Sequence, residues 1–188
     1  AEGAIRGRLI ETVTGIVEAR YRAACRSDPA MLNRNVAEAL AKAEPVSVVV
    51  LDGRGGTRIE ADLAASGGIE HLPGGLLLVT PARFFSTLPD PAGMDQRAAT
   101  QGGEWRERLV LRSGPGLAVD AIPAPVTMEG PTGRLEQIAM AGGDSVVVER
   151  IFRVETVAGP NRPDPEELER LGEAIHEAAR AGILLRRN

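Results

Sequence analysis

The sequence contains few residues of several types on which whole classes of protein depend. Of its 188 residues one is cysteine and two are histidine, and only 3% are aromatic. A single cysteine cannot form an internal disulfide bond, so disulfide-stabilised scaffolds are excluded. The histidines, His71 and His176, stand in none of the short spacings typical of zinc ligands. The sequence therefore predicts no metal site and no cofactor.

Long apolar runs and a strong charge of one sign are also missing. No stretch approaches the roughly 18 apolar residues of a membrane-spanning helix, and the formal net charge is -4. A weakly acidic chain does not favour nucleic acid as a partner, because surfaces that bind phosphate backbones are basic. We expect a soluble, cytoplasmic protein without a membrane segment. Because it begins at Ala1 without a basic and apolar leader, we expect a processed protein or an excised domain.

The length and the order of patterns predict one domain of the α+β class. A prior of about 150 residues per domain assigns the whole chain, residues 1–188, to a single unit. We expect a central antiparallel sheet flanked by N-terminal and C-terminal helices. The helical N-terminal part is predicted at 4–43, the sheet with its loops at 46–157 and the closing helix at 165–185.

Two helices are predicted before the sheet. From Ile5 to Ala24 apolar residues recur three or four positions apart, which is the spacing of one helix face. The second helix begins at Pro29, where Asp28 can cap the backbone N–H groups, and it ends before Pro45. Gly7 and Gly15 weaken the first helix, so it needs a packing partner. We expect that partner in a second copy of the chain.

The middle of the chain contains strand and hairpin patterns. The β-branched run Val46–Leu51 and the alternating run Thr57–Ala61 flank a glycine-rich turn, which predicts a hairpin. A second hairpin is predicted at 135–140 and 145–157, around Gly142-Gly143-Asp144. Further strands are predicted at 76–80, 106–112 and 117–122. Residues 62–75 are predicted to be a connection with one helical turn.

The closing helix has signals at both ends. Asp164 is suited to the N-cap and Pro165 to the first helical position. Acidic residues follow in the first turns and arginines stand towards the end, which complements the helix dipole.

A ligand site is predicted around the long irregular stretch from 81 to 103. Many prolines and glycines interrupt it, and long irregular loops in compact domains are often functional. It contains two of the five aromatic residues and is followed by a third, so aromatic walls and a guanidinium group could hold one small molecule. The predicted ligand-binding residues are Arg83, Phe85, Trp105, Arg106 and His71. The alternative is that Phe84 and Phe85 pack the loop onto the core.

No catalytic residue is predicted. Cys25 lacks the neighbouring histidine pattern of a thiol nucleophile, and no Gly-x-Ser-x-Gly elbow occurs. The glycine-rich segment 52–56 follows a strand but lacks the frame and the Gly-Lys-Ser/Thr ending of a phosphate loop. It is therefore interpreted as a hairpin turn.

Residues 45–53 and 164–180 resemble the first strand with its turn and the closing helix of the GAF family, cytoplasmic sensor domains related to PAS domains. The resemblance implies an antiparallel sheet with helices on one face, a pocket beneath the connecting loops, and a homodimer joined through the first and last helices. Residues 28–52 are also similar to an extracytoplasmic Cache-type sensor, and 142–148 to a late strand of the chorismate-lyase-like fold.

Three functions follow as hypotheses. The first is a non-catalytic sensor or effector-binding regulatory domain, in which a small molecule biases the packing of dimer helices. The second is a small lyase or hydrolase for an anionic substrate, with Arg83, Arg106 or Arg108 as the carboxylate clamp. The third is a structural or assembly protein.

Overall fold

The structure is a computed structural model of the 188-residue chain, and it describes residues 5–15, 18–19, 44–53, 56–65, 69–79, 102–155 and 165–187. Most of these residues form antiparallel strands, and one α-helix has defined bounds among them. None of the helices in the described ranges is long and apolar enough to cross a membrane.

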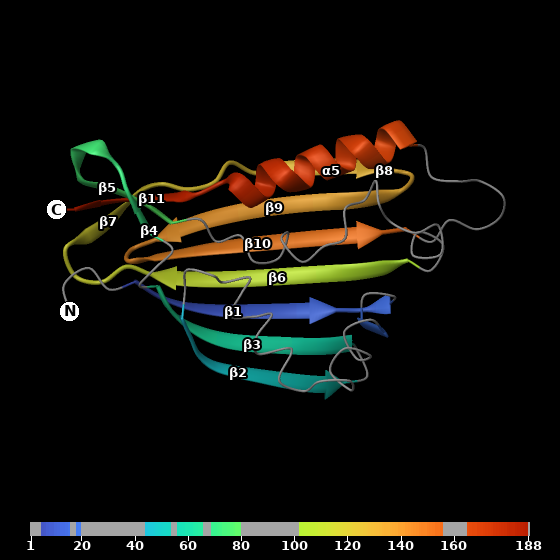
Figure 1. The fold of residues 1–188 in the computed structure, drawn as a ribbon, viewed down its shortest axis with the longest axis horizontal. Coiled ribbons are helices and arrows are strands. Elements are labelled where there is room, and N and C mark those ends of the chain that lie inside the picture. Colours follow the sequence, from blue (N-terminus) through green and yellow to red (C-terminus); the bar gives the residue numbers. More distant parts are fainter. Residues whose placement is uncertain are drawn as a thin grey trace.

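The larger sheet has seven strands in the order β2-β3-β1-β6-β10-β9-β8, and each strand is antiparallel to its neighbours (Figure 1). The strands are β1 (Ile5–Val13), β2 (Glu44–Gly53), β3 (Gly56–Ala65), β6 (Gly103–Arg112), β8 (Val126–Gly130), β9 (Gly133–Gly142) and β10 (Ser145–Val154). Three hairpins, β2–β3, β8–β9 and β9–β10, join strands that are consecutive in the sequence.

A smaller sheet lies at the end of the larger sheet where β6 and β9 finish (Figure 1). Its order is β4-β5-β11-β7, and its strands are β4 (Ile69–His71), β5 (Leu76–Val79), β11 (Ile183–Arg187) and β7 (Leu117–Ala121). A short 3-10 turn, η1 (Pro73–Gly75), precedes β5. The β11–β7 pairing shifts register between Leu184 and Leu185, so a bulge interrupts it.

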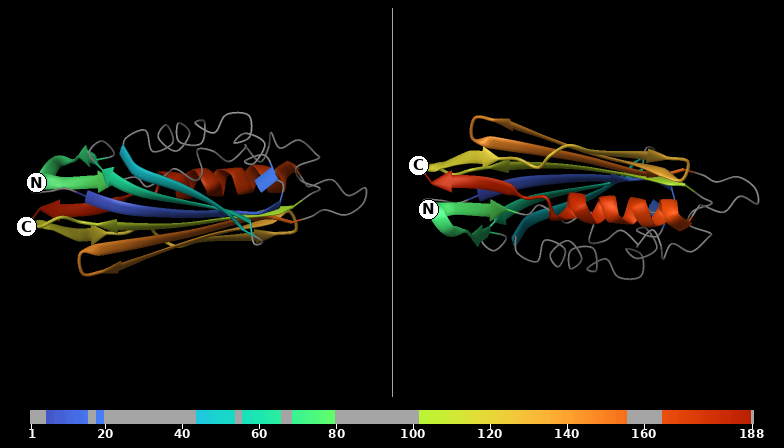
Figure 2. Two further views of the ribbon diagram at one scale, coloured as in Figure 1. Left: turned by 90° about the horizontal axis from the view of Figure 1, so that it is seen from below. Right: turned by 90° about the horizontal axis from the view of Figure 1, so that it is seen from above.

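The helix α5 (Pro165–Arg180) packs along β8 and β9 on one face of the larger sheet (Figures 1 and 2). Its apolar residues Leu171, Ile175 and Ala178 are buried, whereas Glu169, Arg170 and Glu173 are exposed. Only Ala181 and Gly182 separate the helix from β11. The helix and a strand of the smaller sheet are therefore consecutive parts of one segment.

Strand alternation divides the larger sheet into a buried inner face and an open outer face. The inner face contains two groups of buried apolar side chains. The first, here called the seam core, joins the two sheets and consists of Leu9, Ile59, Ala61, Leu109, Leu111, Leu117, Val146, Val148, Ile183 and Leu185. The second, the helix core, lies under α5 and consists of Val13, Trp105, Leu135, Phe152, Val154, Leu171, Ile175 and Ala178.

The predicted N-terminal helix is wrong over residues 5–13, because this segment is the central strand β1. Ile5, Leu9 and Val13 are four residues apart, and a spacing of four places side chains on one helix face but also on one strand face. Pairing with β3 and β6 on both sides favours the strand. The predicted helix over 29–43 lies outside the described residues. A sheet flanked by N-terminal and C-terminal helices, as in GAF or PAS domains, is therefore the wrong architecture.

The closing helix begins at Pro165 as predicted but ends at Arg180 instead of residue 185. Ile183 and Leu185 continue the apolar helical spacing, yet they alternate into the seam core as part of β11. Both predicted hairpins are confirmed, as are strands within 76–80, 106–112 and 117–122. Besides β1 and β11, which lie in predicted helices, the prediction misses two strands: β8, and β4 within the expected connection.

Candidate functional site

A row of buried polar side chains crosses the inner face of the larger sheet. Glu11 of β1 pairs in register with Glu107 of β6, which pairs in turn with Arg150 of β10. Arg150 then pairs with Gln137 of β9. All four residues are at most 2% exposed. The apolar row Leu9–Leu109–Val148 of the seam core lies on one side, and the row Val13–Trp105–Phe152 of the helix core lies on the other. The polar row therefore separates the two cores.

Arg150 is the centre of this row. Its Nη1 donates to Glu107 Oε1 at 2.7 Å, and its Nε donates to Gln137 Oε1 at 2.7 Å. Its Nη2 donates to the backbone oxygen of Ala178 at 3.4 Å. Ala178 is in the last turn of α5, where backbone carbonyls have no partner within the helix. Arg150 therefore connects β6, β9 and the C-terminal end of α5.

Burial makes this connection sensitive to the loss of any partner. The side chains of Arg150 and Glu107 are 0% and 1% exposed, so both charges have been removed from water. Attraction between a buried pair offsets that cost only when the hydrogen-bond geometry is good. Gln137 extends the network, because its Nε2 donates to the backbone oxygen of Ala124 at 3.3 Å.

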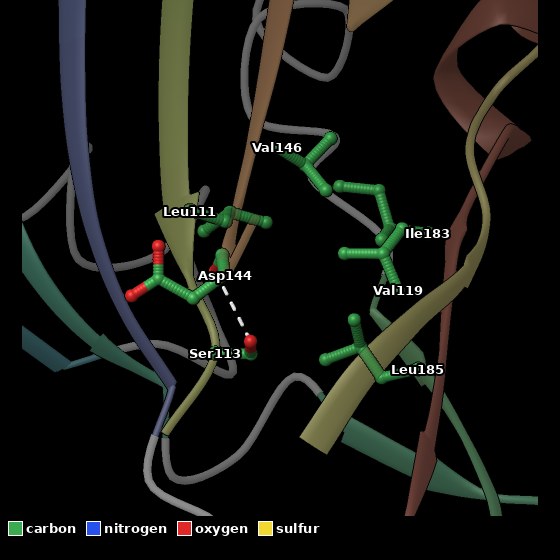
Figure 3. A pocket seen from close by; sticks show the side chains of 7 residues that line it. All are labelled: Leu111, Ser113, Val119, Asp144, Val146, Ile183 and Leu185. Atoms are coloured by element: carbon green, nitrogen blue, oxygen red, sulfur yellow. Dashed lines mark hydrogen bonds between the residues drawn. The ribbon is translucent and has the colours of Figure 1, made fainter. Parts of the chain in front are cut away.

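A small space lies between the two sheets within the seam core (Figure 3). Its volume is about 10 Å³, close to the size of one water molecule. Five apolar side chains line it, from β6 and β10 on one side and from β7 and β11 on the other: Leu111, Val119, Val146, Ile183 and Leu185. Figure 3 shows these side chains facing one another across the gap.

Ser113 and Asp144 complete the lining of this space. The Ser113 hydroxyl donates to the backbone oxygens of Asp144 at 3.0 Å and Leu117 at 3.3 Å, and the Ser113 N–H donates to the same Asp144 oxygen at 2.8 Å. The Asp144 carboxylate points away from the five apolar side chains (Figure 3). The interior of the seam is therefore apolar, and its polar groups are at the edge.

A larger hollow, of about 380 Å³, lies at the other end of the sheet. Its lining is mainly polar and includes Thr14, Gly15, Gly102, Gly103, Glu104, Arg153, Val154 and Glu155. Arg153 and Glu155 form an ion pair at 3.0 Å, so this arginine presents no uncompensated charge. Gly15, at φ +67°, lies so close to the backbone of Gly102 that a Cβ would be 2.6 Å from the Gly102 oxygen.

No protein-family model, curated protein or solved structure matches this chain. We therefore infer a function from the arrangement of its side chains. Among the residues that the structure describes, no group of three His, Cys, Asp or Glu side chains could hold a metal ion.

Three of the predicted ligand-binding residues, His71, Trp105 and Arg106, are described, and they lie in different places. Trp105 is 1% exposed and belongs to the helix core, whereas the neighbouring Arg106 lies on the outer face. Arg106 pairs with Glu104 at 2.5 Å, and this hydrogen bond and charge raise the pKa of the guanidinium. His71 is exposed on β4 of the smaller sheet. Arg83 and Phe85 lie outside the described residues, so their role stays a prediction.

Two of the three arginines expected to clamp an anionic substrate are described, and each pairs with a carboxylate of the protein. Arg106 holds Glu104, and Arg108 holds Glu149 at 2.9 Å on the outer face. Both pairs are well exposed, which limits each to a small contribution to stability.

Sequence reasoning missed the buried polar row, although the strand pattern contained a signal for it. Val146, Val148, Phe152 and Val154 were predicted to share a face of one strand, and Arg150 has the same parity. A charged residue in the middle of a buried apolar face requires a partner, since an isolated buried charge is too costly.

Proposed function

We propose that the protein is a non-catalytic small-molecule sensor in which an apolar ligand enters the seam between the two sheets. The observation that supports this most directly is the apolar space lined from both sides by Leu111, Val119, Val146, Ile183 and Leu185. Because this space is about 10 Å³, a ligand enters only if the sheets move apart. Each buried CH₂ group of the ligand then contributes about 0.8 kcal/mol.

The two sheets can separate without breaking a strand pairing. They form separate hydrogen-bonded ladders, and the seam between them consists of side chains. A ligand that prefers the separated arrangement shifts the population towards it by its difference in affinity for the two states.

The continuity of α5 and β11 provides a route for the signal. Ile183 and Leu185 line the seam, and only two residues separate Ile183 from the end of α5 at Arg180. Arg150 holds that end through Ala178. Displacement of β11 therefore acts on the last turn of the helix by weakening the Arg150–Ala178 hydrogen bond. The exposed side of α5 is polar and contains Glu169, Arg170, Glu173 and Glu177. In this proposal α5 replaces the dimer helices as the signalling element; the homodimer and the cytoplasmic location stay predictions.

Thermal unfolding with decanol and dodecanoate as probes tests the proposal. A probe at 100 times its Kd stabilises the folded protein by about 2.7 kcal/mol. For a chain of this size the melting temperature then rises by roughly 5–10 °C. Val119→Phe places a ring in the seam and should abolish this rise. Val126→Phe, the same change at a partly buried valine that packs against the helix core, should retain it.

A milder variant, Val119→Thr, keeps the test valid if Val119→Phe does not fold. Val119→Thr keeps the side-chain volume but adds a hydroxyl to the apolar wall, so probe affinity should fall about tenfold. No rise in melting temperature with either probe, or an equal rise in wild type and Val119→Phe, would contradict the proposal.

A further inference from the structure

The outer face of the larger sheet contains arginines in two different situations. Six of them hold a carboxylate of the protein, and they are Arg8, Arg58, Arg106, Arg108, Arg134 and Arg153. Their partners are Glu60, which is shared by the first two, Glu104, Glu149, Glu136 and Glu155. These six positive charges are therefore largely compensated.

Arg6 and Arg112 are the exceptions on this face. They are direct register partners across β1 and β6, and both side chains are exposed. Within the described part of the chain, no carboxylate lies within ion-pair distance of either guanidinium. Like charges directly opposite one another on neighbouring strands are unfavourable. An external anion placed between them removes that repulsion.

An apolar row begins beside these arginines. Val110, the outer-face neighbour of Arg112 on β6, pairs with Val147 on β10, which pairs with Met140 on β9. Met140 is 50% exposed, and Ile138, two residues earlier on the same face of β9, is 42% exposed. The basic pair and the exposed apolar side chains are thus parts of one continuous surface.

We propose that this surface binds peripherally to an anionic lipid bilayer. Arg6 and Arg112 contact the lipid headgroups, and the side chains of Met140 and Ile138 insert into the interfacial region of the bilayer. The views along the sheet show α5 on the opposite side (Figure 2), and the four named side chains of the outer face are exposed. A small anion would gain little enclosure there, whereas small-molecule sites are concave. A bilayer presents a matching extended surface with many anionic groups.

The position of the basic pair also relates this surface to the seam. Arg112 is next to Leu111, and its register partner Ser145 is next to Val146. Leu111 and Val146 line the seam on the inner face. An apolar molecule leaving the bilayer would therefore meet the seam at the same end of β6 and β10. The membrane proposal itself does not depend on the seam binding a ligand.

Sedimentation with lipid vesicles tests the proposal on the full chain. Binding to vesicles of equimolar phosphatidylglycerol and phosphatidylcholine should exceed binding to pure phosphatidylcholine. Replacing two arginines near an anionic surface should weaken binding about thirtyfold, so Arg6→Gln/Arg112→Gln is the diagnostic variant. Arg106→Gln/Arg134→Gln removes the same formal charge from the same face but from compensated positions. It should change binding less than threefold.

Two further measurements separate the sources of anionic charge. Met140→Gln should weaken vesicle binding severalfold while the melting temperature stays unchanged, because this side chain is half exposed. Inorganic phosphate at low millimolar concentration should not displace the protein from vesicles. Displacement by phosphate, equal binding to polyglutamate, equal binding to both vesicle types, or an equal loss in the control double variant would overturn the proposal.

Discussion

The seam core and the helix core lie on the same face of the same strands, yet their outer walls are held differently. Over the helix core, both ends of α5 are fixed to the sheet by polar contacts. Glu167 accepts hydrogen bonds from the Thr132 N–H at 3.0 Å and hydroxyl at 2.8 Å, and Arg150 holds Ala178 at the other end. Over the seam core, β7 and β11 contribute apolar side chains around a small space.

This difference distinguishes a wall held by buried hydrogen bonds from a wall held by apolar contacts, and it underlies our proposal that the seam opens. Hydrogen bonds with buried partners require specific geometry and are costly to leave unmade. Apolar contacts are not directional, and they permit a wall to move when another apolar group replaces it. The proposed ligand entry is therefore in the seam core, and we expect the helix core to supply structural stability, with the polar row as the boundary.

The largest effect is expected at the boundary itself. Arg150→Met removes the charge partner of Glu107 and the donors to Gln137 and Ala178, so the free energy of unfolding should fall by about 3–5 kcal/mol. Chemical denaturation measures this change. Arg108→Met is the matched control, because Arg108 and Glu149 occupy the next register position of the same two strands on the outer face. It should cost less than about 1 kcal/mol. Equal losses would show that the buried row has no special role.

Truncations of apolar side chains in the two cores should destabilise the fold nearly as much, but the two losses should be unequal. Phe152→Ala in the helix core should lower the free energy of unfolding by about 3–5 kcal/mol. Leu185→Ala in the seam core should cost about 2–3 kcal/mol, since its wall can move inward. Denaturation curves of both variants give the comparison. A larger loss for Leu185→Ala would reverse the assignment of fixed and movable cores.

Substitutions at the start of α5 should lower the free energy of unfolding by an intermediate amount. Glu167→Ala leaves the buried Thr132 N–H and hydroxyl without their acceptor, which should cost about 1–3 kcal/mol. Gly130→Ala should cost a similar amount, because a Cβ there would collide with the Glu167 carboxylate. The two changes act on one contact, so the double variant should be less destabilised than their sum. Additive losses would show that Gly130 acts in another way.

The smallest effect is expected on the outer face and depends on pH. The hydrogen bond from Arg8, followed by that from Arg58, lowers the pKa of Glu60 below its ordinary value of about 4.5. A lowered carboxyl pKa stabilises the folded state above the ordinary value, and that stabilisation is lost as the pH falls through the folded value. Glu60→Gln should therefore reduce the melting temperature slightly at pH 7 and by less at pH 3. A reduction of equal size at both pH values would exclude the ion pair as its cause.

The local parts of the fold could be predicted from sequence because turn residues and alternation specify them. Gly142-Gly143-Asp144 between alternating strands predicted the β9–β10 hairpin, and Asp164-Pro165 predicted the start of α5. β1 could not be predicted in this way, since the four-residue spacing of Ile5, Leu9 and Val13 fits a helix and a strand equally well. Its conformation depends on β3 and β6, which are distant in the sequence.

The candidate site was less predictable for the same reason. The seam brings Leu111 and Val119 together with Val146, Ile183 and Leu185 from separate regions of the chain. Each of them is an ordinary apolar strand residue in the sequence. Trp105 and Arg106 were grouped because they are adjacent, but adjacent residues of a strand point to opposite faces.

Nuclear Overhauser effects between decanol and the methyl groups of the protein show where the ligand binds. We expect contacts from the decanol chain to the methyl groups of Val119, Ile183 and Leu185. We expect none to Leu135, Leu171 or Ile175 of the helix core. Decanol that raises the melting temperature but contacts the helix-core methyl groups, or no methyl group of the seam, would contradict the proposal.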